Sequence, residues 1–131
     1  MAVFMAQLIA STPVGWTQTL PSLQSRIPNP DPKKYQAIRD AADWKNPYLI
    51  VRRDGVEIIG RMAVEHSIPV DSVPGALKEL PESAWPYGLV VVVQDNGIVS
   101  PGDPARIKAN RKTLLALLKK FDVAVELWPS A

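Results

Sequence analysis

The most strongly patterned stretch of the chain is an uninterrupted apolar run from Leu89 to Val93, in which four residues are valine. Pro86 precedes it and Asp95-Asn96-Gly97 follows it, so the run is too short for a helix. β-Branched side chains pack well on both faces of a pleated sheet. The pattern therefore predicts a central strand over residues 88–94, buried on both of its faces.

A helix and a second strand follow the central strand. Apolar residues at helical spacing define one face over residues 103–121: Ile107, Leu114, Leu117, Leu118 and Phe121. Residues 123–128 then alternate apolar and mixed side chains, which is typical of an edge or half-covered strand. Strand, helix and strand in this order predict a right-handed parallel βαβ unit.

Shorter patterns precede the central strand. Residues 48–53 and 56–59 predict two strands, and Asp54-Gly55 between them favours a type I′ hairpin turn, in which both central residues have positive φ. Residues 67–70 predict a short extended piece. A helix is expected over residues 73–80, with a cap at Asp71-Ser72 and Pro74 in its first turn.

The first quarter of the chain gives weaker signals. Residues 1–25 contain no charged side chain, and the apolar stretch Ala2–Ala10 resembles the core of a secretory signal, although no Lys or Arg precedes it. Four prolines between residues 21 and 32 predict an extended linker. Residues 35–44 have the spacing of one short helix at best. We therefore expect a lead over residues 1–33 and one globular domain over residues 34–131.

Together these elements predict a small α+β domain. Its single mixed sheet contains the β-hairpin and the C-terminal βαβ unit, and two helices cover it. The length of 131 residues, with 47% hydrophobic and 21% charged residues, is ordinary for one soluble globular domain. No apolar stretch approaches the ~20 residues of a membrane helix, so no transmembrane segment is expected.

The composition excludes several kinds of chemistry. The chain has no cysteine, which removes disulfides, zinc–thiolate and iron–sulfur sites, and thiol nucleophiles. His66 is the only histidine, and neither a nucleophile elbow nor a zinc-binding histidine pair accompanies it. No catalytic residue, metal ligand set or cofactor is therefore predicted. Carboxylate chemistry stays open as a minority alternative, with four candidate acids: Asp71, Glu79, Glu82 and Asp95.

The loop after the central strand is the first candidate binding site, because α/β sheets bind ligands at the carboxyl ends of their strands. Its polar candidates are Asp95, Asn96, Ser100 and Asp103. Gly97 and Gly102 have the separation of a phosphate loop, but Asp103-Pro104 follows where such a loop carries Lys and Ser or Thr. A carboxylate at a helix start repels phosphate. The favoured interpretation is an ordinary loop in which Asp103 caps the helix.

Two further features are candidates for binding. Lys108, Lys112 and Lys119 share one flank of the last helix, where they either contact nucleic-acid phosphates or solvate the helix. The net charge is only +2 and no aromatic residue is interleaved with these lysines, so nucleic acid is not expected as a partner. Trp85 either packs over the sheet end or forms the rim of a groove.

The order of apolar positions and turns resembles a known family. It comprises the hairpin Leu49–Ile58, the segment Ile68–Leu80, the strand Val90–Asp95, and a leucine-rich helix before Val123-Ala124-Val125. Over residues 47–128 this is similar to the periplasmic domain of ExbD/TolR-type proteins, the partner subunits of proton-driven envelope motors. The resemblance implies a small mixed sheet with two helices, dimerisation, and binding of partner peptides or the cell wall in the periplasm.

The family's membrane helix, with its proton-carrying Asp, has no counterpart before Asp31, so the resemblance implies no proton-coupled role. We expect a non-enzymatic binding or assembly module of the bacterial envelope. It would pair an exposed sheet edge with a partner peptide or with a second copy as a homodimer. Ligand binding or catalysis at loop 95–103, weak nucleic-acid binding by the helix flank, and a cytoplasmic rather than periplasmic or secreted location stay open.

Overall fold

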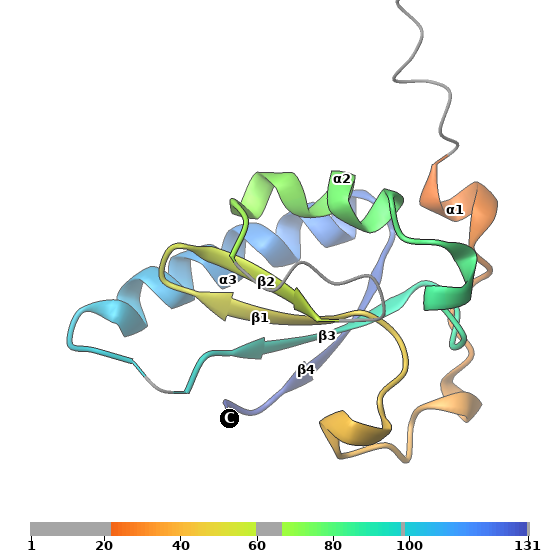
Figure 1. The fold of residues 1–131 in the computed structure, drawn as a ribbon, viewed down its shortest axis with the longest axis horizontal. Coiled ribbons are helices and arrows are strands. Elements are labelled where there is room, and N and C mark those ends of the chain that lie inside the picture. The colour runs from red at the N-terminus through yellow and green to blue at the C-terminus, as the bar shows by residue number, and fades with distance from the viewer. Residues whose placement is uncertain (1–21, 60–66, 98, 131) are drawn as a thin grey trace, which may run out of the picture.

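The computed structural model describes residues 22–59, 67–97 and 99–130, and within them four strands form one mixed sheet (Figure 1). Its order is β2-β1-β3-β4. β1 (Tyr48–Arg52) pairs antiparallel with β2 (Gly55–Ile59) and parallel with β3 (Val90–Asp95). β3 pairs parallel with β4 (Ala124–Trp128). The predicted α+β class, with a hairpin and a C-terminal βαβ unit in one sheet, is confirmed.

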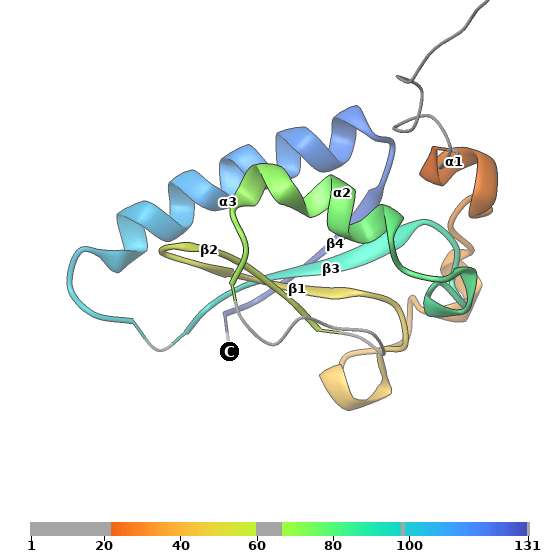
Figure 2. The ribbon, with the colours of Figure 1, turned by 45° about the horizontal axis from the view of Figure 1, so that its top comes forward.

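Helices α2 (Val73–Lys78) and α3 (Asp103–Lys120) cover the same face of the sheet (Figure 2). Both helices carry a proline in their first turn, where the missing N–H costs nothing. Ser72 provides no side-chain cap for α2, contrary to expectation. The buried residues of α3 are Ile107, Leu114 and Leu118, which belong to the predicted apolar stripe. A third helix, α1 (Leu23–Arg26), adds one further turn to this layer.

The two faces of the sheet bury different side chains. On the helix face, β1 and β3 contribute aliphatic residues, among them Leu49, Val51, Val91 and Val93. On the opposite face, Val90 and Val92 pack against aromatic residues: Tyr35, Trp44, Tyr48 and Tyr87. All four valines of β3 are 0% exposed, so the predicted central strand is indeed buried on both faces.

The described part of the predicted lead packs on the domain rather than extending away as a linker. Leu23 and Ile27 are each 2% exposed, and the Leu89 N–H donates to the Pro28 carbonyl at 2.9 Å. The short helix considered for residues 35–44 does not form. Instead the chain makes single 3₁₀ turns at Pro32–Lys34 and Ala41–Asp43. The side chains of Asp31 and Asp40 accept backbone N–H groups in these turns, which competes with a continuous helix.

The hairpin lies where it was predicted, but its turn is one residue earlier. Arg52 pairs with Gly55, so Arg53 and Asp54 are the two loop residues, and neither has positive φ. The type I′ prediction is therefore wrong. Gly55 is needed for another reason, since a Cβ there would lie 2.1 Å from the Ile68 carbonyl oxygen. This close approach lets Ile68 pair with Val56 on the outer side of β2.

Candidate functional site

The carboxyl ends of β1 and β3 lie side by side at one edge of the sheet. From β1 the chain turns to β2 on one side, and from β3 it continues through α3 to β4 on the other. Such a switch point is where α/β sheets usually bind ligands. A pocket of about 300 Å³ lies here. Its lining is mainly polar: Arg52, Arg53, Asp54, Asn96, Ser100, Asp103 and Ile107.

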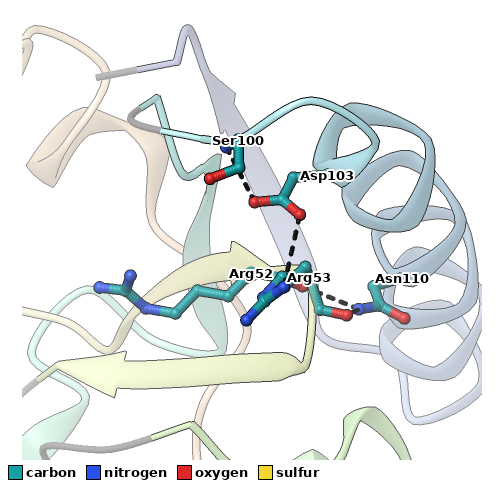
Figure 3. Close-up of polar contacts among 5 residues, drawn as sticks. All are labelled: Arg52, Arg53, Ser100, Asp103 and Asn110. Atoms are coloured by element: carbon teal, nitrogen blue, oxygen red, sulfur yellow. Dashed lines mark hydrogen bonds and ion pairs between the residues drawn. The ribbon is translucent and has the colours of Figure 1, made fainter.

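Side-chain contacts tie the loop after β3 to α3 and to the end of β1 (Figure 3). Asp103 accepts a hydrogen bond from the Ser100 N–H at 3.0 Å, and its other oxygen lies 3.8 Å from Arg53 Nη1. Asn110 donates to the carbonyl oxygens of Arg52 and Arg53 at 2.8 and 3.1 Å. The helix cap is Gly102, with a φ of +90°, whereas Asp103 occupies the first turn. The Asp103 carboxylate therefore lies at the N-terminus of α3, where an anion would have to bind.

Two further ion pairs lie at this edge. Arg111 forms an ion pair with Asp95, and Arg52 forms one with Glu57. A second pocket, of about 330 Å³, lies beside Asp95, Asn96, Lys108 and Arg111. The Asp95 Oδ1 atom is buried without a hydrogen-bond partner among the described residues. The structure thus brings Asp95, Asn96, Ser100, Asp103 and Lys108 to one edge of the sheet, where Asp95 and Asp103 form ion pairs with Arg111 and Arg53.

Three candidate binding residues do not join this cluster. Lys112 and Lys119 are exposed farther along α3 and line neither pocket. Trp85 is 3% exposed and packs in the helix-side core, so it does not form a groove rim. His66 lies outside the described residues. The three lysines of the basic flank, Lys108, Lys112 and Lys119, are all exposed, and Trp85 contributes to packing.

The sequence predicts an edge or half-covered strand over residues 123–128, and in the structure β4 is an edge strand. Which of its sides is open, and the groove beside it, come from the structure alone. The Ala124 N–H donates to the Leu89 carbonyl, so the backbone groups of Val125 and Leu127 point away from β3. No described residue pairs with that outer side. Leu127 is 62% exposed. On β2, by contrast, Val56 and Ile68 exchange two backbone hydrogen bonds at 2.8 and 2.9 Å, so that edge is partly covered.

A groove of about 500 Å³ runs beside β4 on the face opposite the helices. Its lining comes from both ends of the chain: Pro32, Tyr35, Gln36, Arg39, Glu126, Leu127, Trp128 and Pro129. Trp128 packs edge-on against Trp44 and Tyr48, with ring centroids 5.8 and 5.7 Å apart. Aromatic contacts of this geometry hold the groove wall in place.

The groove carries negative charge next to its aromatic wall. Burial raises the pKa of the Tyr35 phenol above its ordinary value, and the carboxylates of Glu126 and Asp31 raise it further. Glu126 forms no ion pair with any described residue. The one cationic residue of the lining, Arg39, donates from Nη1 to the carbonyl oxygens of Gln36 and Ile38.

Comparison of the chain with family models, with curated proteins and with solved structures gives no match. None of the helices in the described ranges combines the length and the hydropathy that crossing a membrane requires. The described part of the chain also holds no group of three or more His, Cys, Asp or Glu residues placed to bind a metal ion. A function for this chain therefore has to be inferred from its own sequence and geometry.

Proposed function

We propose that this chain is a binding or assembly module that pairs the outer side of β4 with an extended segment of a partner protein. The observation that carries the proposal is the row of outward backbone groups on Val125 and Leu127, next to an aromatic groove. An unpaired strand edge supplies main-chain hydrogen bonds to an added strand, and pockets beside it select side chains.

Strand edges that remain unpaired are usually blunted by a bulge, a proline or an inward-pointing charge. β4 pairs regularly with β3 along its whole length, without a bulge. Proline appears only after the strand, at Pro129. The single charge, Glu126, points toward the groove face. These features leave the edge available to a partner, which supports the proposal.

The test uses one exposed position with two substitutions. Leu127→Pro removes an outward N–H, and proline is tolerated on an edge strand when its missing N–H faces solvent. Leu127→Thr removes the same apolar side chain but keeps the N–H. Peptides selected from a random display library on the full-length chain should bind the Thr variant and lose binding to the Pro variant. Thermal unfolding checks that both variants fold. Equal binding to both variants would show that the edge is not the contact.

We also propose that the module acts in the bacterial envelope, as an ExbD/TolR-type domain. The support is the sequence pattern over residues 47–128 and the apolar stretch Ala2–Ala10. Cell fractionation with N-terminal sequencing of the product tests the compartment. A product outside the cytoplasm that begins after the apolar stretch supports it, whereas a cytoplasmic product that keeps Met1 or Ala2 contradicts it.

A second candidate function is binding of a small polar ligand at the carboxyl ends of β1 and β3. The switch-point pocket of about 300 Å³ favours it, and this volume is at the lower end of the range for ligand sites. Chemical-shift mapping with a small-molecule library on the full-length chain tests it. Shifts that cluster at Asn96, Ser100 and Asp103, and that Ser100→Ala weakens, would support this site. Chemical-shift changes confined to other residues would rule out a ligand site at the carboxyl ends of β1 and β3.

A further inference from the structure

We infer that the partner segment carries a lysine or arginine opposite Glu126, with an apolar residue on each side of it. This inference rests on the proposed pairing at β4 and specifies its partner. The juxtaposition that points to it is a carboxylate on the edge strand that forms no ion pair with any described residue and lines one groove together with Tyr35 and Trp128.

The alternation of side chains along a strand fixes which partner residue meets which surface. In a partner strand added to β4, running in either direction, the residue opposite Glu126 places its side chain on the same face of the sheet as Glu126. That side chain therefore enters the groove. Its two neighbours lie on the other face, beside Val125 and the exposed Leu127. Opposite charges directly across two strands attract, and aromatic rings also hold a cation. The recognised pattern is therefore apolar, basic, apolar.

The other charges around the groove agree with this assignment. Asp31 adds a second carboxylate near Tyr35. Arg39 is the only cation in the groove lining, and it already donates to two backbone carbonyls of its own turn. A basic side chain entering beside Glu126 therefore meets its carboxylate and the aromatic rings, while the Arg39 guanidinium, which keeps its charge, is held against its own turn through Nη1.

Two other occupants fit less well. In a symmetric antiparallel pair of two copies, Val125 opposite Leu127 uses all the outward backbone groups, but it places Glu126 directly opposite Glu126 of the second copy. Like charges in that position are destabilising. The chain's own N-terminal stretch, residues 1–25, contains no charged side chain and so places no lysine or arginine opposite Glu126. The charge pattern thus selects a segment of a different protein.

The experiment uses three synthetic peptides that differ at one position, with the sequence Gly-Ser-Thr-Val-X-Val-Thr-Ser-Gly, blocked ends, and Lys, Gln or Glu at X. On the full-length chain, the Lys peptide should bind about fivefold tighter than the Gln peptide, with the Glu peptide weakest. Glu126→Gln should reduce the difference between the Lys and Gln peptides, and Glu126→Lys should reverse the order so that the Glu peptide binds best. Titration by fluorescence anisotropy measures the three affinities.

The controls separate this inference from the proposal beneath it. Equal affinities for the three peptides, all reduced by Leu127→Pro but not by Leu127→Thr, would overturn the basic preference while leaving edge pairing intact. Affinities unchanged by Leu127→Pro, or no binding of any peptide, would count against edge pairing itself. Light scattering that shows a dimer of the full-length chain, dissociated by Leu127→Pro, would assign the edge to a second copy and overturn the inference.

Discussion

Trp128 meets Trp44 edge-on, with ring centroids 5.8 Å apart and ring planes at 70°. Trp44 is itself fixed, because its Nε1–H donates to the Pro47 carbonyl at 3.1 Å. The end of the edge strand is therefore held by a residue from the N-terminal half of the chain. Since Trp128 also lines the groove, the same contact links the stability of the domain to the shape of its candidate binding surface.

Trp44→Ala should lower the free energy of unfolding by about 3–5 kcal/mol, because it removes a buried aromatic ring and leaves a cavity. Trp44→Phe keeps a ring and should cost clearly less. Urea denaturation followed by far-UV circular dichroism measures both. A Trp44→Ala variant that unfolds at the wild-type urea concentration would mean that the aromatic cluster does not hold β4.

Asn46 should be the most costly polar side chain to remove. It is 2% exposed, donates to the carbonyls of Gly88 and Val90 at 2.8 and 2.7 Å, and accepts the Tyr87 N–H at 2.9 Å. Asn46→Ala leaves these buried groups unpaired, so we expect a loss of about 2–4 kcal/mol in unfolding free energy.

Asn110→Ala is the matched control for Asn46→Ala. Asn110 also bonds two backbone carbonyls, those of Arg52 and Arg53, but in a more exposed place. Water can replace its amide there, so the expected loss is about 1 kcal/mol or less. Equal losses for the two variants in urea denaturation would contradict the central role assigned to the buried amide.

Much of the fold follows from local patterns in the sequence. The valine run, the leucine spacing of α3 and the Asp-Gly hairpin signal are each contained within one element, so the sheet and its main helices could be predicted. The 3₁₀ turns could not, because side-chain capping by Asp31 and Asp40 competes with the helical spacing that the apolar residues suggest. The burial of Leu23 and Ile27 likewise depends on tertiary contacts that no local pattern encodes.

The candidate sites divide in the same way. Asp95, Asn96, Ser100 and Asp103 lie in and at the two ends of one loop, so the sequence could place them together. Their ion-pair partners Arg53 and Arg111 come from a hairpin turn and a helix, and only the fold brings them there. The β4 groove joins Tyr35 to Trp128, and no spacing rule relates residues at opposite ends of a chain. For Trp85 the sequence left packing and a groove rim open, and only the tertiary contacts show that its side chain is buried in the core.

Two glycine substitutions should change stability in opposite directions. Gly55→Ala places a Cβ against the Ile68 carbonyl, at 2.1 Å before any relaxation, so it should break the pairing of Ile68 with Val56 and destabilise the domain. Gly75 lies inside α2 with nothing within 4 Å of an added Cβ. Gly75→Ala should therefore stabilise by about 0.5–1 kcal/mol. Thermal unfolding of both variants beside the wild type gives the two signs, and a stabilised Gly55→Ala would refute the close approach.

Heparin chromatography tests the basic flank of α3. We expect the full-length chain to pass through heparin at low salt, because its net charge is only +2 and Lys108, Lys112 and Lys119 form a single row. The triple substitution of these lysines to Glu should then leave the elution unchanged. Retention of the wild type that the triple variant loses would assign the flank to a polyanion instead.

Glu126→Gln should lower the pKa of Tyr35 without restoring its ordinary value. Burial is the largest cause of the raised Tyr35 pKa, Glu126 is the next, and Asp31 contributes least. Removing one negative charge from the groove makes the tyrosinate easier to form, whereas burial continues to oppose it. The pKa of Tyr48 is raised by burial alone, so it should not move and serves as the internal control. Titration of ¹³Cζ-labelled tyrosines by NMR follows each phenol separately.

The same shift has a consequence for stability at high pH. Because the folded phenol has the higher pKa, the unfolded chain loses this proton first as the pH rises. The contribution of Tyr35 is therefore complete below the unfolded value of about 10 and is lost between that value and the folded pKa. Glu126→Gln lowers the folded pKa and so narrows this pH interval. In urea denaturation across the interval, the free energy of unfolding should fall less for the variant than for the wild type. Parallel losses in both proteins, or a Tyr48 pKa that moves as far as that of Tyr35, would show that Glu126 does not act on the groove phenol.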